Sequence, residues 1–321
     1  MASKGKEREN FFRINVLVVD HIKNVLVHMF KYYLRKKKMS LEEFIDEHMA
    51  DIKYLRIRKN LHKEQIDKLI VGDKAISDIT EDGLEVTLVR RLIDNLCPDL
   101  FMDDGCKTLQ DFLKKNQHDI YHIFKFNERC CQCSQDYKFP VTSQLLQDDQ
   151  YKKMFKLSPC ANCAGGIGMV CSVSSCIVTE YIRLDYKIKC QIFGHFTPIF
   201  KAMQKFTDLR NIAYGHADAA EIPNERYDVY KHDIEENIMV LARICGNEDE
   251  TRLALDDVQK RSCDETLCIQ YQNRLMELME VCICNIYKKV MVFNATFQQY
   301  FSYVVAVSFI HGENHRPAAS H

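Results

Sequence analysis

The sequence predicts a mainly α-helical protein that is interrupted by a small cysteine-rich insert with a few strands. Three observations indicate this fold class. Apolar residues recur every three or four positions along most of the chain, cysteines and glycines concentrate between residues 128 and 196, and one run in that block alternates between apolar and polar residues. A helical face requires a period near 3.6 and a half-buried strand a period of two. The 321 residues suffice for one large domain or two small ones.

The amino-terminal part, residues 8–127, reads as the first part of a helical bundle. Apolar side chains recur through residues 10–35 and predict a long helix. The basic run 35–38 lies at the carboxyl end of this helix, where positive charges interact favourably with the helix dipole. Ser40-Leu41-Glu42-Glu43 matches a capping box and predicts a second helix over residues 40–58. Further helices are expected near 63–70, over 84–96, where Pro98 stops the helix, and over 108–126.

Residues 128–196 have a different character and predict a small insert. Cysteines are dense there, and Gly165, Gly166 and Gly168 punctuate the block. From Tyr181 to Lys189 the even positions are apolar and charged residues occupy odd positions, which predicts a half-buried strand. We expect strands only within about residues 175–192.

Helical periodicity then resumes over residues 197–246, which read as the last two helices of the bundle. The first spans 198–214 and should break at Gly215, and the second spans 224–244 with Asn224 as its cap. The Cys245-Gly246-Asn247 segment ends this second helix. Residues 247–321 are expected to form a helical carboxyl-terminal extension, of which the last residues, 316–321, look frayed.

The composition constrains the partners and the cellular location. A formal net charge of −1 gives no global attraction to nucleic acid, so any RNA contact needs a local basic patch. The polar start is unlike a signal peptide, and polar residues interrupt the most apolar late stretch, 281–310, so no membrane contact is expected. Fifteen cysteines then indicate reduced thiols with metal binding as the first chemistry to test, and a cytoplasmic location.

The segment from Leu209 to His216 carries the candidate catalytic residues Arg210, Asn211 and His216. On a straight helix Arg210 and His216 lie about 120° apart, but a left-handed Gly215 would end the helix and let His216 fold back. The guanidinium would hold a phosphate, and a His that titrates near neutrality would move the proton of a 2′-hydroxyl or a leaving oxygen. Asn211 would orient the His or a phosphate oxygen. This chemistry cleaves RNA without a metal ion and leaves a 2′,3′-cyclic phosphate.

The spacing alone is weak evidence. Arg and His recur at the same separation at Arg56/His62 and at Arg226/His232. Arg210 can equally bond carbonyls at a helix end and His216 can cap it, so a structural or interaction role stays open. If the site works, we expect a homodimer in which two copies of the pair surround one phosphate.

Four segments carry a resemblance to a known family, the HEPN (higher eukaryotes and prokaryotes nucleotide-binding) superfamily. They are Asn10-Phe11-Phe12-Arg13-Ile14-Asn15, Leu55-Arg56-Ile57-Arg58, Glu85-Val86-Thr87-Leu88, and Leu209-Arg210-Asn211 with Tyr214-Gly215-His216. Within it the chain resembles the branch of the HEPN domain of the DAZ-interacting zinc-finger ubiquitin ligase, over residues 8–127 and 197–245. The resemblance implies an α-helical bundle, commonly dimeric, and a metal-independent ribonuclease motif. A RING-type array is absent from the sequence, so ligase activity does not carry over.

The cysteines predict one structural zinc site. Cys130 and Cys133, and again Cys160 and Cys163, form two Cys-x-x-Cys knuckles whose thiolates suit tetrahedral Zn²⁺. Four thiolates leave no open position, so catalysis by this metal is excluded, and reduced cysteines in a loop are the alternative. His118 and His122 have a metal-compatible spacing, but with no third ligand in view they read as ordinary histidines.

Two classes of function follow from the sequence. The first is a HEPN-domain protein that binds or cleaves RNA through Arg210, Asn211 and His216. The second is a non-catalytic helical interaction or adaptor module, in innate-immune-type signalling, that contacts protein partners through its carboxyl-terminal helices. A cysteine protease and a phosphate loop are both disfavoured, since no Cys has the required partners and the stretch 165–168 lacks the Lys-Ser/Thr of a phosphate loop.

Overall fold

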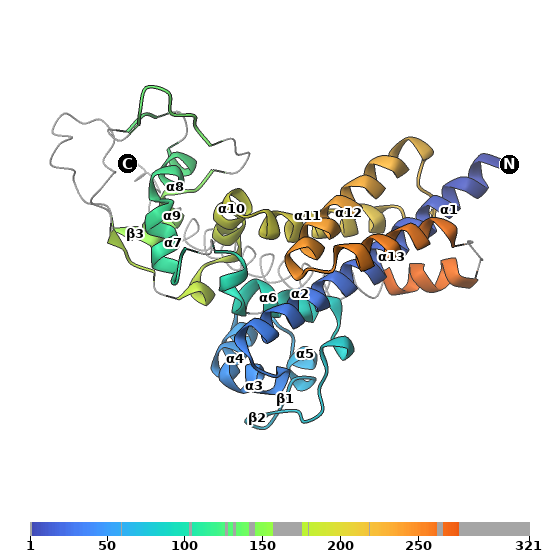
Figure 1. Ribbon diagram of the computed structural model, residues 1–321, viewed down its shortest axis with the longest axis horizontal. Helices are drawn as coiled ribbons and strands as arrows, with labels where there is room; N and C mark the ends of the chain where they lie inside the picture. The colour runs from blue at the N-terminus through green and yellow to red at the C-terminus, as the bar shows by residue number, and fades with distance from the viewer. Residues whose placement is uncertain are drawn as a thin grey trace, which may run out of the picture.

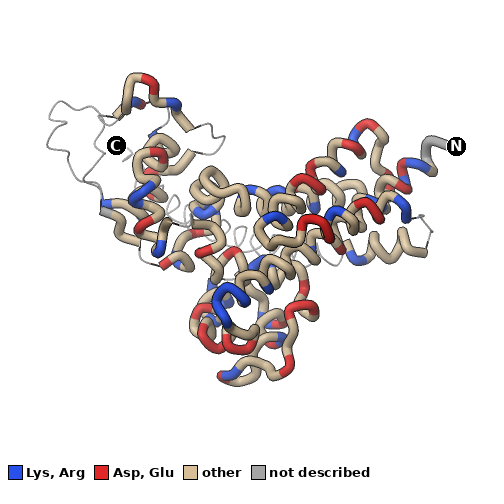
Figure 2. Tube along the Cα trace, in the orientation of Figure 1, with Lys and Arg blue, Asp and Glu red and all other residues tan. Residues whose placement is uncertain are grey.

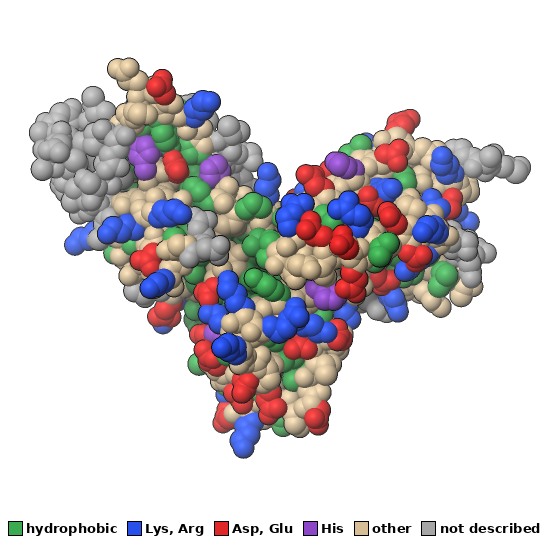
Figure 3. Space-filling view, in the orientation of Figure 1, with side chains coloured by type: hydrophobic (Ala, Val, Ile, Leu, Met, Phe, Trp, Pro, Cys, Tyr) green, Lys and Arg blue, Asp and Glu red, His purple; other side chains and the backbone are tan. Residues whose placement is uncertain are grey.

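The computed structural model is mainly helical, as the sequence predicted, and three arms extend from a central group of helices (Figure 1). It describes residues 2–275 apart from 59, 103–104, 126–127, 131–132, 141–144, 157–174, 179, 218 and 262–265. A wide notch separates the two upper arms in the space-filling view (Figure 3).

One long helical rod forms the amino-terminal part. It consists of α1 (Ala2–Val16), a π-helical turn η1 (Leu17–His21) and α2 (Ile22–Lys37), so the predicted helix 10–35 is confirmed. The apolar stripe faces the core, where Phe11, Leu26 and Phe30 are fully buried. Lys38 then adopts a left-handed conformation, with φ of 57°, that ends the rod.

The lower arm follows, and its first helix begins as the capping box predicts. The Ser40 hydroxyl accepts a hydrogen bond from the Glu43 amide at 3.1 Å, and the Glu43 carboxylate accepts one from the Ser40 amide at 2.6 Å. The predicted helix 40–58 is divided in two by His48. The helices of this arm are α3 (Leu41–Glu47), α4 (Met49–Ile57) and α5 (Lys63–Asp67).

A short hairpin closes the lower arm, and it corrects the prediction that strands occur only near 175–192. Strand β1 (Ile70–Val71) pairs antiparallel with β2 (Lys74–Ala75). Gly72 occupies the turn with φ of +64°, a conformation that glycine adopts without a steric cost. This hairpin could not be predicted from the sequence because each strand has only two residues, too few to show a period.

The chain then returns to the centre and enters the arm at the upper left in Figure 1, which begins with the helices of residues 109–124 and is called the third arm below. The short helix η2 (Glu81–Gly83) precedes α6 (Val86–Leu96), which ends before η3 (Pro98–Leu100) as the proline predicts. The predicted helix 108–126 is present as α7 (Leu109–Lys115) and α8 (Gln117–Phe124), which Asn116 separates.

The insert contains one more helix and a two-stranded ladder in its described part. Helix α9 (Asp148–Met154) leads into β3 (Phe155–Lys156), which pairs antiparallel with β4 (Ser175–Cys176). Only β4 lies where strands were expected.

The predicted strand at 181–189 is wrong. These residues form η4 (Tyr181–Arg183) and the start of α10 (Tyr186–Phe196). The alternating run is followed by Ile192, and Leu184, Ile188 and Ile192 lie four residues apart on one buried face. Their spacing is that of a helix face and continues past the end of the alternating run. The burial of this face against the rest of the protein therefore favours a helix over a strand.

Two long helices and a shorter one complete the described chain. They are α11 (Pro198–Gly215), α12 (Asn224–Cys245) and α13 (Glu248–Lys260), and residues 266–275 are also helical. The helices predicted at 198–214 and 224–244 are therefore confirmed. Of the extension 247–321, the part beyond residue 275 lies outside the described residues.

Two local expectations at these helix ends are wrong. Gly215 belongs to α11 instead of adopting a left-handed conformation, whereas Gly246 does so, with φ of +72°, and ends α12. Asn224 does not cap α12 either. Pro223 is the cap residue instead. The Asn224 side chain accepts a hydrogen bond from the side-chain amide of Asn10 at 2.9 Å, which connects α12 with α1.

Helices α2, α6, α10, α11 and α12 pack against one another at the centre. Aromatic side chains extend this core into the third arm. The Phe112 ring of α7 stacks on Phe193 of α10 with their centroids 4.9 Å apart, and Phe101 meets Phe200 of α11 edge-on at 5.0 Å. These contacts fix the position of α7 and therefore of α8, which follows after one residue.

Acidic and basic residues are interspersed along most helices (Figure 2), which agrees with the net charge of −1.

Among the helices described, none has both the length and the apolar content needed to cross a bilayer. The eight cysteines described are all free thiols.

Candidate metal centre

Helix α8 supplies two histidines to one site in the third arm. His118 and His122 are four residues apart, so both side chains lie on the same face of the helix. Their Nε2 atoms are 3.3 Å apart and their rings meet edge-on. Since His122 is buried and His118 is half-buried, the pair lies at the edge of the arm rather than deep in the core.

The chain that follows α8 folds back and places two cysteines against these histidines. The Cys133 amide donates to the Cys130 carbonyl at 3.2 Å, which holds the two cysteines close together. Arg129 supports this arrangement, since its guanidinium donates to the carbonyls of Ser134 and Gln135. The Cys130 amide also points at the Cys133 sulfur, 3.4 Å away, where it would stabilise a thiolate.

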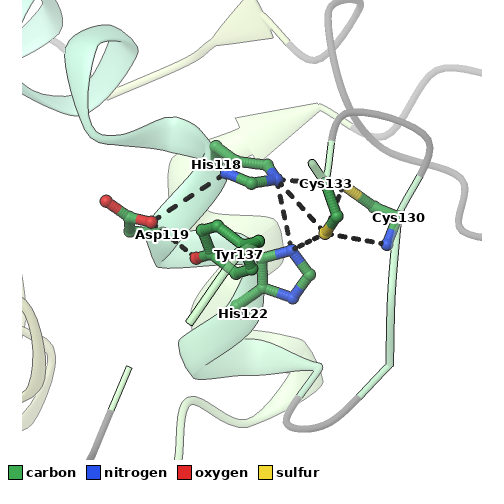
Figure 4. Close-up of polar contacts among 6 residues, drawn as sticks. All are labelled: His118, Asp119, His122, Cys130, Cys133 and Tyr137. Carbon is green, nitrogen blue, oxygen red and sulfur yellow. Dashed lines mark hydrogen bonds and ion pairs between the residues drawn. The ribbon is translucent and has the colours of Figure 1, made fainter. Parts of the chain in front are cut away.

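The four donor atoms converge on one point (Figure 4). The two sulfurs are 3.7 Å apart, and the His118 Nε2 atom lies 3.2 Å from the sulfur of Cys130 and 3.6 Å from that of Cys133. The His122 Nε2 atom is 3.1 Å from the Cys133 sulfur. All four atoms lie within 4.8 Å of one another.

These separations can be compared with a tetrahedral zinc site. With Zn–N distances of about 2.05 Å and Zn–S distances of about 2.3 Å, a regular tetrahedron separates two nitrogens by about 3.3 Å, two sulfurs by about 3.8 Å and a nitrogen–sulfur pair by about 3.6 Å. The nitrogen–nitrogen distance of 3.3 Å and the sulfur–sulfur distance of 3.7 Å agree with this geometry. Three of the four nitrogen–sulfur distances, 3.1 to 3.6 Å, are equal to it or shorter by up to about 0.5 Å. The fourth, between His122 Nε2 and the Cys130 sulfur, falls within the 4.8 Å that bounds the whole cluster. The cluster can therefore hold one ion of this size.

The protonation states of the cluster are compatible with the binding of a cation. Burial, and then the neighbouring His118, lower the pKa of His122, so its imidazole is neutral and has a lone pair for a metal. Burial raises the pKa of Cys133 and keeps the thiol protonated when no cation is near. A divalent ion supplies the positive charge that a thiolate needs, so metal binding would release protons.

Aromatic side chains surround the two imidazoles. The ring of Tyr137 lies 4.6 Å from that of His118 and 4.8 Å from that of His122, and Phe139 lies 5.1 Å from His122. Tyr137 also donates a hydrogen bond to the Asp119 carboxylate at 2.6 Å. Burial, and then this carboxylate, raise the pKa of Tyr137, so its phenol stays protonated.

Half of this donor set could be predicted from the sequence. Cys130 and Cys133 belong to a cluster that could hold a metal ion, while the predicted partners Cys160 and Cys163 lie outside the described residues. The sequence showed no third ligand near His118 and His122, but the structure places both within reach of Cys130 and Cys133. The one sequence signal was their spacing of four residues, only eight residues before Cys130.

The residues predicted to be catalytic lie at the end of α11. Arg210 donates to the Asn211 side chain at 3.2 Å and lines a small cavity with Arg90 of α6 and apolar side chains of the α1–α2 rod. The His216 ring is half-buried, 6.3 Å from the ring of Tyr230 on α12. Arg210 and His216 thus have different neighbours within one chain, and their catalytic role stays a prediction.

No model of a protein family matches this chain, and no similar protein was found among curated proteins or among solved structures. The resemblance to the HEPN superfamily therefore rests on the quoted residues alone.

Proposed function

We propose that this chain is a zinc-binding helical protein in which His118, His122, Cys130 and Cys133 hold one structural Zn²⁺. The convergence of four donor atoms within 4.8 Å carries the proposal. Two imidazoles and two thiolates are a donor set that zinc prefers, and four protein ligands leave no position for a substrate. The proposed role is therefore to stabilise structure.

The donors come from two successive parts of the chain, which defines what the ion would stabilise. His118 and His122 belong to α8, whereas Cys130 and Cys133 belong to the segment at the start of the insert. The ion would tie that segment to the helix and limit the number of conformations that it adopts. The energy of metal binding would then add to the folding energy of the third arm.

Metal analysis of the purified protein tests the proposal. We expect about one zinc per chain, and Co²⁺ in its place should give the absorption bands of a tetrahedral site with thiolate ligands. His122→Asn and Cys133→Ser should each lose the ion. Cys245→Ser, which changes a half-buried thiol on α12, is the matched control and should retain it.

A double variant, Cys160→Ser with Cys163→Ser, distinguishes this site from the four-cysteine site that the sequence predicted. Because His118 and His122 complete the tetrahedron, the double variant should retain one zinc. Loss of the ion in the double variant together with full occupancy in His122→Asn would contradict the proposed ligand set.

A second proposal concerns RNA, and one observation favours it. Arg210 lines a small cavity beside the π-helical turn η1 together with Arg90, whose own guanidinium is paired with Asp94. The Arg210 guanidinium would hold a phosphate, as the predicted Arg–Asn–x4–His motif requires. We propose that this region binds RNA and that His216 supports its cleavage, in a dimer that contributes two copies of the motif.

Incubation of the protein with labelled RNA in EDTA tests this second proposal independently of the zinc. We expect products with 2′,3′-cyclic phosphate ends, loss of cleavage in His216→Ala, and RNA affinity that falls steeply with salt. Sedimentation at micromolar concentrations tests the dimer. A protein that neither binds nor cleaves RNA would leave the adaptor function as the remaining proposal.

A further inference from the structure

The ring nitrogen of His118 that does not face the metal centre lies toward an acidic side chain. Its Nδ1 atom is 3.9 Å from Oδ1 of Asp119, while Nε2 is the atom that meets the two sulfurs (Figure 4). The separation is longer than a hydrogen bond, and the two groups form an ion pair only when the imidazole is protonated. Asp119 is nevertheless the residue whose charge faces the back of this imidazole.

The same carboxylate oxygen is held from its other side. The Tyr137 hydroxyl donates to Oδ1 of Asp119 at 2.6 Å, so the phenol fixes the oxygen that faces His118. The Tyr137 ring also contacts both imidazoles, at 4.6 Å and 4.8 Å between centroids. One side chain therefore orients the carboxylate and limits the rotation of both histidine rings.

A histidine ligand needs such a partner for a physical reason. Its metal-binding nitrogen must carry a lone pair, so the proton must reside on the other nitrogen, and a carboxylate beside that nitrogen stabilises this tautomer. The negative charge also makes the ring a stronger donor toward a cation. Removal of such a partner typically weakens metal affinity about 10- to 100-fold.

We propose that Asp119 and Tyr137 are positioning residues of the metal centre, with Tyr137 holding Asp119 so that its carboxylate fixes the tautomer and orientation of His118. The inference rests on the proposed zinc site, and neither residue contacts the ion. Asp119 sets the proton on Nδ1, and the Tyr137 hydroxyl keeps the carboxylate in place. The Tyr137 ring acts separately, through its contacts with the two imidazoles.

Zinc affinity in four proteins tests the proposal, measured by competition with a chromophoric chelator at pH 7.5. Asp119→Asn should bind zinc about 10- to 100-fold more weakly than the wild type. Tyr137→Phe removes only the hydroxyl and keeps the ring, so its affinity should fall in the same direction by a smaller factor. Asp136→Asn is the matched control, because Asp136 is an exposed carboxylate on the same segment, and its affinity should equal that of the wild type.

Two further measurements separate positioning from a general loss of structure. The metal-free forms of the four proteins should all be folded and should give the same far-ultraviolet circular dichroism spectrum. The ¹⁵N chemical shifts of His118 in the zinc-loaded wild type should show a protonated Nδ1, and this signal should broaden or shift in Asp119→Asn.

The possible failures are distinguishable. A wild-type protein that binds no zinc overturns the site and the inference together. A wild type that binds zinc while Asp119→Asn binds it equally well, with an unchanged His118 spectrum, overturns the positioning role alone. If Asp136→Asn is weakened as much as Asp119→Asn, the effect is one of net charge, which also contradicts the inference.

Discussion

Lys189 allows one prediction to be worked out from the structure in numbers. The residue lies on α10, its side chain is 0% exposed, and its ammonium donates to the Asn95 side chain at 3.0 Å and to the Asp94 carbonyl at 3.4 Å. The ring of Tyr181 lies 4.2 Å from the nitrogen. Burial lowers the pKa of Lys189 from 10.5 to about 8, and the charge of Asp94 only partly opposes this effect.

The sign of the effect on stability follows from this lowered pKa. Between pH 8 and 10.5 the unfolded chain binds the lysine proton and the folded chain has lost it, so the free energy of unfolding rises with pH in this range. Below pH 8 both states are protonated and the cost of burying the charge is fully present. The two pKa values differ by about 2.5, which corresponds to about 3 kcal/mol over the whole range.

The assay is urea unfolding of the wild type and of Lys189→Met at pH 7.5 and at pH 10. Between these two pH values the wild type should gain about 2 kcal/mol relative to the variant, because most of the titration lies between them. The acceptors Asn95 and Asp94 lose their donor in the variant at both pH values, and nearby tyrosines and cysteines titrate in both proteins. These effects largely cancel in the comparison. A difference between the proteins that does not change with pH would refute the reasoning.

Three further predictions concern the metal and two helix ends. Removal of zinc by a chelator should increase protease cleavage and amide exchange in residues 128–137, while exchange in α11 and α12 stays unchanged; equal protection with and without metal would argue against a structural ion. Ser40→Ala should lower the free energy of unfolding by about 1 kcal/mol because the Glu43 amide loses its acceptor, as urea unfolding would measure, whereas Ser40→Asp should preserve the cap. Gly246→Ala should cost about 1 to 2 kcal/mol because φ is +72° there, and Gly215→Ala, at a helical position, should instead stabilise the protein or have little effect.

The helices could be predicted because their apolar periods are long. Residues 10–35 and 224–244 each offer several turns of one buried stripe, and such a pattern has few alternatives. The failures occur where the pattern is short. The hairpin of β1 and β2 has two residues in each strand, and the nine residues 181–189 fit a strand equally well until Ile192 extends the helical stripe.

Predictions of helix ends were less successful, and glycine shows why. Gly215 and Gly246 both end an apolar pattern and both can adopt a left-handed conformation, but only Gly246 does. At the end of α11, His216 keeps a right-handed backbone with φ of −100° and continues into the loop. The sequence shows what a glycine permits, whereas the position of the following segment decides whether that freedom is used.

The metal centre was predictable only in part for a related reason. A Cys-x-x-Cys turn is a local feature, so the placement of Cys130 and Cys133 in a donor cluster could be predicted from their spacing. His118 and His122 become candidate ligands only because the chain reverses direction after α8 and returns within eight residues. That reversal depends on packing, and a spacing of four residues does not reveal it.

The proposed His and Cys ligands differ from four cysteine ligands in which parts of the chain the ion would hold together. A zinc ion held by four cysteines of the insert would stabilise the insert by itself. An ion held by His118 and His122 together with Cys130 and Cys133 would instead connect the insert to α8, across the boundary that the sequence predicts at residue 128. Since Phe112 of the neighbouring α7 stacks on Phe193 of α10, that connection would extend to the central helices. Substitution of a single ligand should therefore loosen α8 together with residues 128–137, while α11 and α12 keep their packing.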